Sequence, residues 1–159
     1  MGLSIRFATP RDAQVIVQFV RGLAEYEREP EAVEVTPEML RAQMESADPP
    51  FECLIAEHDG VAAGFALFFR NYSTWRGRPG LFLEDLFVVP DYRRKGIGRA
   101  LLQRLAAIST ERGYGRMEWS VLDWNTPAHE FYRALGATPL DQWTIWRLSG
   151  DALGRAARS

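Results

Sequence analysis

The apolar and polar positions of the chain follow two kinds of pattern, one with the two-residue period of a strand and one with the spacing of an amphipathic helix. Strands are predicted at residues 3–7, 51–57, 61–69, 81–89, 116–122 and 144–148. Helices are predicted at residues 10–27, 37–44, 97–112 and 126–135. A loop is expected at residues 71–80, which are rich in Gly, Pro and Trp, and the tail after Gly150 is expected to fray. Because strands and helices alternate, the sequence predicts one α/β (α+β) domain over residues 1–159, built on a mixed sheet.

Local cap and turn signals support several of these elements. Two helices begin at Thr-Pro pairs, Thr9-Pro10 and Thr36-Pro37, in which Thr can cap the helix and Pro fits its first position. Asp12 lies three residues after Thr9, as in a capping box. The sequence His-Asp-Gly at 58–60 separates two strand patterns and predicts a hairpin.

The composition is that of an ordinary globular protein. Apolar residues make up 47% of the 159 residues, charged residues make up 25%, and the formal net charge is −2. This charge gives no reason to expect a nucleic-acid partner. We find no signal peptide and no apolar run long enough to cross a membrane, so we expect a cytoplasmic protein without a membrane partner. One Cys and two distant His form no metal-ligand cluster, and Cys53 is expected to be a buried core thiol.

Glu84 and Asp85 interrupt an otherwise apolar strand. Neighbouring strand residues point to opposite faces, so Glu84 should lie beside Phe82 and Asp85 beside Leu83 and Phe87. Burying a carboxylate costs free energy, and apolar surroundings raise the pKa of a Glu into a range that suits a general base. Each acid taken alone is better explained by a structural role, in which it caps a loop or pairs with Arg. The pair, followed directly by a glycine-rich helix start, favours a functional role.

The sequence Arg-Arg-Lys-Gly-Ile-Gly, residues 93–98, lies between this strand and the next helix. The free N–H groups of a helix N-terminus and the helix dipole favour an anion, and Gly96 and Gly98 would let a ligand approach the backbone. Lys95 and the neighbouring arginines add positive charge. The spacing is neither that of a Walker A motif nor that of a dinucleotide fingerprint. Taken alone, the sequence fits a tight turn and a solvated helix end as well as an anion site.

These six residues fit the Q/R-x-x-G-x-G/A pattern of the GNAT family of N-acetyltransferases, in which the matching loop holds the pyrophosphate of acetyl-coenzyme A (acetyl-CoA). Two longer stretches, LEDLFVVPDYRRKGIG and WNTPAHEFYRALGA, resemble the branch that contains spermidine/spermine and thialysine acetyltransferases. The resemblance covers nearly the whole chain and weakens after Ala137. It implies a mixed, mostly antiparallel sheet flanked by helices, with acetyl-CoA at a splayed strand pair, no metal, and a homodimer.

The resemblance also implies a set of site residues. The cofactor-binding positions are Phe87, Val88, Val89, Arg94, Lys95, Gly96, Ile97, Gly98, Arg99, Asn125 and Ala128. The catalytic positions are Tyr132, as the acid that protonates the departing thiolate, and Glu84, which accepts the proton of the amine through water. Tyr26, Glu27 and Glu84 match substrate-binding positions. The chemistry agrees, because an alkyl amine with a pKa of about 10 must lose a proton before it attacks, and a phenol with a pKa of about 10 can protonate a leaving group.

The sequence narrows the substrate only to a class. Residues 25–34 hold five Glu and one Arg, and they form either a solvated face or a surface that steers a cationic amine. Animal enzymes of this branch that act on polyamines carry an acid near the position of Thr144, so a diamine or a lysine-like amine fits as well as a polyamine. We therefore expect an acetyl-CoA-dependent N-acetyltransferase of small-molecule primary amines. A protein-Lys or N-terminal acetyltransferase and a non-catalytic acyl-CoA sensor are the alternatives, and retention of Glu84 and Tyr132 argues against the sensor.

Overall fold

A computed structural model describes residues 2–158. The chain divides into two compact units, residues 1–120 and 121–159. The first unit contains the sheet, and the second contains the C-terminal helices. The prediction of a single domain over residues 1–159 stays a prediction.

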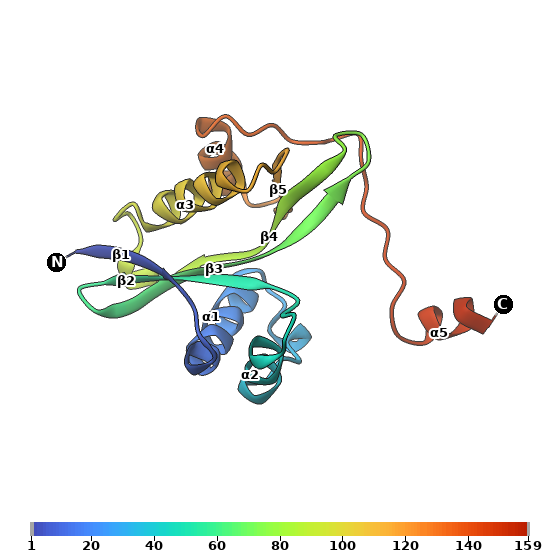
Figure 1. The fold of residues 1–159 in the computed structure, drawn as a ribbon, viewed down its shortest axis with the longest axis horizontal. Coiled ribbons are helices and arrows are strands. Elements are labelled where there is room, and N and C mark those ends of the chain that lie inside the picture. The colour runs from blue at the N-terminus through green and yellow to red at the C-terminus, as the bar shows by residue number, and fades with distance from the viewer. Residues whose placement is uncertain (1, 159) are drawn as a thin grey trace. The chain divides into compact units, whose positions relative to one another are not determined.

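The sheet of the first unit is mixed and mostly antiparallel, as predicted (Figure 1). In spatial order its strands are β1 (Leu3–Phe7), β2 (Glu52–His58), β3 (Val61–Ser73), β4 (Arg78–Val88) and β5 (Met117–Trp119). Neighbouring strands from β1 to β4 pair antiparallel, whereas β4 and β5 pair parallel. A parallel pair needs a long crossover connection, and helix α3 (Ile97–Glu111) supplies it.

Helices cover both faces of this sheet (Figure 1). Helices α1 (Ala13–Tyr26) and α2 (Pro37–Glu45) lie on one face, and α3 lies on the other. The core beneath α1 and α2 is built from apolar side chains that are almost completely buried, among them Ile16, Val17, Phe19, Leu40, Ile55, Phe65 and Phe87. The stripe predicted for α3 is buried as well, with Ile97, Leu101, Leu102, Leu105 and Ile108. The sheet and its helices therefore form around two apolar layers that the periodicity predicted.

The predicted caps and the predicted hairpin are confirmed. The N–H of Met39 donates to Oγ1 of Thr36 at 3.2 Å, which caps α2. The N–H of Thr9 donates to Oδ2 of Asp12 at 2.7 Å, within the short 3-10 turn that leads into α1. Between β2 and β3, Asp59 and Gly60 have φ angles of 52° and 82°, which a two-residue type I′ turn requires.

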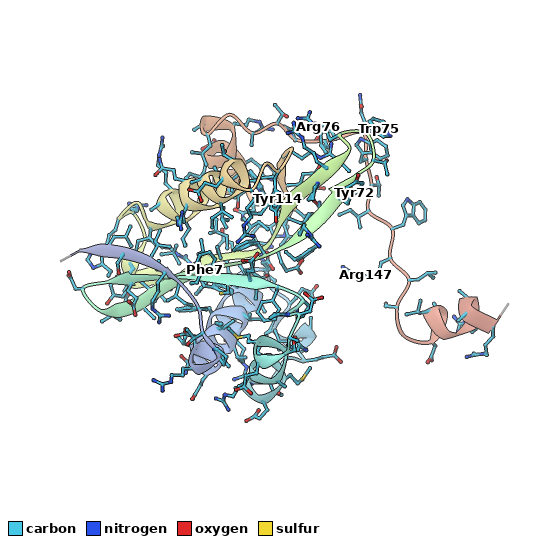
Figure 2. All side chains as sticks on the ribbon, in the orientation of Figure 1. Phe7, Tyr72, Trp75, Arg76, Tyr114 and Arg147 are labelled. Carbon is cyan, nitrogen blue, oxygen red and sulfur yellow. The ribbon has the colours of Figure 1, made fainter. Side chains whose placement is uncertain are left out.

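The prediction of a loop at residues 71–80 is wrong, because most of these residues extend β3 and β4. Asn71 pairs with Gly80 and Ser73 with Arg78, which leaves only a short turn at 74–77. Figure 2 shows Trp75 and Arg76 at the tip of this hairpin. Gly and Pro have low strand propensity, but cross-strand pairing supplied by the partner strand outweighs it.

Other boundaries near the C-terminus also differ from the prediction. Strand β5 covers only part of the predicted range 116–122. In the second unit, α4 (Thr126–Ala134) forms as predicted, but residues 144–148 form no strand. The tail that was expected to fray forms helix α5 (Gly150–Arg158). A strand needs a partner strand for its backbone hydrogen bonds, whereas a helix forms these bonds within itself. The local sequence therefore could not show whether residues 144–148 form a strand.

Candidate active site

The register of β4 shifts at the two acids. Leu67 of β3 pairs with Asp85, but the next residue, Phe68, pairs with Leu83, so Glu84 has no counterpart on β3. One extra residue on one strand is a β-bulge, which locally bends the strand and changes where its side chains point. The bulge therefore places the two acids at an irregular point of the strand.

Because of the bulge, the side chains of β4 do not alternate between the two faces of the sheet as predicted. Asp85 and Phe87 share the face that packs beneath α1, as predicted, because their partners Leu67 and Phe65 belong to that core. Leu83 lies opposite Phe68 and faces the other way, which the simple alternation did not predict. The expectation that Glu84 lies in apolar surroundings is also wrong, since its side chain is exposed and Asp85 is the more buried acid.

Three carboxylates act on one another beside this bulge. Burial, together with the nearby charges of Glu84 and Glu27, raises the pKa of Asp85 to about 7. Burial also raises the pKa of Glu27, again with a contribution from Glu84. Glu27 directly follows the last residue of α1, so helix α1 and strand β4 together form this acidic cluster. The predicted site residues included Glu27 and Glu84, whereas Asp85 was considered only as the second acid of the Glu84-Asp85 pair.

Among the described residues, no strand pairs with the outer edge of β4 beyond the acids. Its pairing with β5 covers Leu81 to Leu83 only, whereas β4 continues to Val88. The N–H of Val89 donates to the carbonyl of Ala63 at 2.8 Å, so the backbone N–H of Val89 points toward β3. Because backbone groups alternate in direction along a strand, Val88 is the residue among the predicted Phe87, Val88 and Val89 whose backbone faces the open edge. The ring of Phe87 itself is buried.

The loop of residues 93–98 has the shape of an anion cradle. Arg94 and Gly96 have φ angles of 64° and 79°, and Gly96 caps α3 without any side-chain hydrogen bond. The first N–H groups of α3 therefore have no side-chain acceptor from their cap. A Cβ at Gly98 would meet only Cγ2 of Val88, at 3.9 Å, so space in front of this residue is open. These features fit a phosphate group bound at the start of α3.

The remaining predicted residues of the loop divide by exposure. The side chains of Arg94, Lys95 and Arg99 are exposed, so their charges can reach an anion in front of α3. The side chain of Ile97 is only 1% exposed and belongs to the core, so this residue can offer a ligand only its backbone. The predicted cofactor residues of the loop thus offer a ligand three cationic side chains and backbone N–H groups.

Arg93, which sequence reasoning treated only as a charge, makes specific contacts. Its Nε donates to the carbonyl oxygen of Val88 at 3.0 Å. Its guanidinium carbon lies 5.5 Å from the ring centroid of Tyr26 and 5.7 Å from that of Phe87. Tyr26 is the last residue of α1, and its side chain is 41% exposed. The first Arg of the motif therefore joins the loop to β4 and to α1.

The three predicted residues of the second unit lie on or next to α4. Asn125 is the N-terminal cap position of this helix, and Ala128 lies in its first turn. Tyr132 is half-buried, and its ring centroid lies 5.5 Å from that of Phe131. Tyr132 therefore packs against a neighbouring aromatic ring, and the chemical role of its phenol stays a prediction.

Other kinds of site find no support among the described residues. No group of three or more His, Cys, Asp or Glu among residues 2–158 could hold a metal ion. No helix in this part of the chain is long and apolar enough to span a membrane. Cys53 is buried, and burial raises the pKa of its thiol, as expected for a core cysteine.

The model of the Acetyltransferase (GNAT) family matches residues 18–137 of the chain. The chain belongs to this family. It is 35% identical over 164 residues to the thialysine N-epsilon-acetyltransferase of Bos taurus, an alignment that covers 96% of each chain. It is 44% identical over 108 residues to the L-ornithine N5-acetyltransferase NATA1 of Arabidopsis thaliana, which covers 67% of this chain and 47% of that one.

The fold agrees with the family. An integron cassette protein from the mobile metagenome of V. cholerae has a TM-score of 0.83 with this chain, at 23% identity, over 100% of this chain and 99% of the other. As a GNAT protein with named N-acetyltransferase relatives, the chain is an acyltransferase. The family uses acetyl-CoA.

Proposed function

We propose that this GNAT protein transfers an acetyl group from acetyl-CoA to a primary amine of a small molecule that carries further positive charge. The observation that supports it best is the cluster of Glu27, Glu84 and Asp85 beside the open edge of β4. The negative charge gathered at this point adds to the effect of burial in raising the pKa values of Asp85 and Glu27, and a cationic ligand would relieve that repulsion. The named relatives act on thialysine and ornithine, which both carry a side-chain amine and an α-amino group.

The cradle and the β4 edge would hold the cofactor. The N–H groups at the start of α3, with Arg94, Lys95 and Arg99, would bind its phosphates, because donors and cations converge there. The backbone N–H of Val88 at the open edge would pair with the pantetheine arm, since the carbonyl of Val88 accepts from Nε of Arg93. Asn125 and Ala128 are further proposed contacts. Bound acetyl-CoA supplies an activated acetyl thioester. None of this requires a metal ion.

The proposed proton transfers use two residues. Glu84 is exposed at the bulge, so a water molecule can reach it, and it accepts the proton that the alkylammonium must lose before attack. Tyr132 protonates the departing sulfur, for which its phenol has a suitable pKa in solution of about 10. Tyr26 and Glu27 at the end of α1 contact the amine, with Asp85 as an additional partner for its positive charge.

We propose a homodimer as the assembly. Trp143, Ile145, Trp146 and Leu148 are 69%, 76%, 91% and 59% exposed along one segment of the second unit. Large apolar side chains gathered on one exposed segment are typical of an interface. A second copy of the chain is the proposed occupant, and light scattering of the wild type and of Trp146→Ser tests it. A wild type that stays monomeric at micromolar concentration would contradict the proposal.

The function is tested by release of free thiol from acetyl-CoA with a panel of amines. The panel contains thialysine, ornithine, lysine, putrescine, spermidine and a Lys-containing peptide. We expect turnover with the small diamino compounds and little with the peptide. Turnover of the peptide alone would assign a protein acetyltransferase, and no turnover with any amine despite binding of CoA would leave an acyl-CoA sensor.

A further inference from the structure

Arg93 occupies a position that no proposed ligand contact explains. Its guanidinium faces back toward the protein, where Nε binds the carbonyl of Val88 at 3.0 Å and the group lies over the rings of Tyr26 and Phe87. Contacts of a guanidinium with aromatic faces are favourable because the ring faces are negative. One side chain thus fixes the end of β4, the end of α1 and the beginning of the cradle loop relative to one another.

The ring of Phe87 makes this arrangement stiff. Gly22 of α1 lies so close that a Cβ there would come within 2.7 Å of Cζ of Phe87. Phe87 is also 6.1 Å from Phe19, measured between ring centroids, and is 8% exposed. The ring therefore has little freedom to move, and it provides a fixed surface for the guanidinium. Tyr26, which is 41% exposed, is the less buried of the two rings.

The two ends of this contact lie at the two halves of the proposed site. Arg93 directly precedes residues 94–98, which form the proposed phosphate cradle. Tyr26 directly precedes Glu27, whose carboxylate interacts with Glu84 and Asp85. Contacts of Arg93 with Val88 and Tyr26 therefore connect the loop to the residue that precedes Glu27.

We infer that Arg93 is a positioning residue that couples occupation of the phosphate cradle to the geometry of the amine side of the site, through its contacts with Val88 and Tyr26. The inference rests on the proposed function for the identity of the two halves. Binding of CoA and binding of the amine then favour each other, because each ligand orders the contact between Arg93 and Tyr26. Replacement of Arg93 removes this coupling and leaves each half able to bind alone.

The coupling is observable by 19F NMR of protein labelled with 3-fluorotyrosine, with CoA as the ligand. The chain has five Tyr residues, and single Tyr→Phe variants assign their resonances. Tyr92 lies next to the loop, so its resonance reports whether CoA occupies the cradle. Tyr26 contacts Arg93, so its resonance reports whether the effect of CoA reaches the end of α1. In the wild type we expect CoA to shift both resonances. In Arg93→Lys, which keeps the charge but loses the planar guanidinium, saturating CoA should still shift Tyr92 and should no longer shift Tyr26.

Kinetics provide the second measurement. With thialysine as the amine and saturating acetyl-CoA, Arg93→Lys should raise the KM for the amine by roughly fivefold or more, with a smaller change in kcat. The exposed Arg41→Lys on α2 is the matched control and should change neither. A wild-type Tyr26 resonance that ignores bound CoA would overturn the inference, and so would an equal shift in Arg93→Lys. Absence of any CoA binding, seen as an unmoved Tyr92 and no heat of binding, would instead refute the proposed function.

Discussion

Gly22 of α1 lies directly against the ring of Phe87 on β4, since a Cβ at this position would stand 2.7 Å from Cζ. Ala favours a helix over Gly by about 1 kcal/mol, but overpacking a core costs about 1–3 kcal/mol. We expect Gly22→Ala to lower the free energy of unfolding by about 1 kcal/mol and to displace the ring that supports Arg93. Urea unfolding measures the change.

The control for this prediction is the same substitution beside a smaller partner. In Phe87→Leu the steric conflict is relieved, so adding Gly22→Ala should be neutral or stabilising. Additive effects of the two substitutions would show that the contact does not limit the packing of α1 on β4.

Asp85 should make stability depend on pH. Burial raises the pKa of Asp85 to about 7, so between pH 4 and pH 7 the folded protein holds a proton that the unfolded chain has lost. The unfolding free energy contributed by this group therefore falls as pH rises through that window. Asp85→Asn removes the dependence, and we expect it to stabilise the protein at pH 8.5 by roughly 1–3 kcal/mol and by clearly less at pH 5.

Asp12 provides a control of opposite sign. Hydrogen bonds from Arg6, together with the attraction of its charge, lower the pKa of Asp12. Its contribution to stability is present above the ordinary pKa of an Asp and is lost in acid, so Asp12→Asn should destabilise the protein at neutral pH. Urea unfolding at several pH values compares the two variants, and a gain from Asp85→Asn that does not change with pH would contradict the first prediction.

Gly98→Ala should separate cofactor binding from folding. The added Cβ meets only Cγ2 of Val88 at 3.9 Å, and Ala favours a helix over Gly, so we expect no loss of Tm. The methyl group, however, occupies the space in front of α3. Affinity for CoA, measured by calorimetry, should fall by roughly tenfold or more, which corresponds to about 1.4 kcal/mol. Gly96→Ala, at a φ of 79°, should also lose stability by about 1–2 kcal/mol. Equal CoA affinity in Gly98→Ala and the wild type would place the phosphates elsewhere.

Lys95 allows a direct test of the cradle because it is the single lysine of the chain. An amine-reactive acetylating reagent should modify it readily, since its side chain is exposed. Desulfo-coenzyme A, which has the phosphates but no thiol, should slow this modification by roughly tenfold at ten times its Kd, by simple occupancy. The α-amino group in the same sample is the internal reference. Equal slowing of both amines, or of neither, would argue against phosphate binding at this loop.

Tyr132→Phe tests the proposed acid. Loss of the phenol proton should lower turnover by about 10²-fold, whereas the affinity for CoA should stay the same because the ring remains. Thiol release and calorimetry together provide the measurement, and Phe131→Leu controls for the aromatic packing between the two rings. Unchanged turnover in Tyr132→Phe would remove this residue from the mechanism.

The sequence by itself determined the elements whose signals are local. The caps at Thr9 and Thr36, the turn at Asp59-Gly60 and the apolar stripe of α3 were all predicted, because each depends on residues a few positions apart. The loop of residues 93–98 was located for the same reason, since its glycines and the following helix are adjacent in the chain.

Only the tertiary structure showed the features that depend on contacts between residues distant in the sequence. The bulge at Glu84 follows from the register with β3, and it makes Asp85 the more buried acid, which strict alternation could not show. Arg93 contacts Tyr26, which lies 67 positions earlier in the sequence. Residues 144–148 have a strand pattern, yet they form no strand, because a strand exists only where another backbone pairs with it.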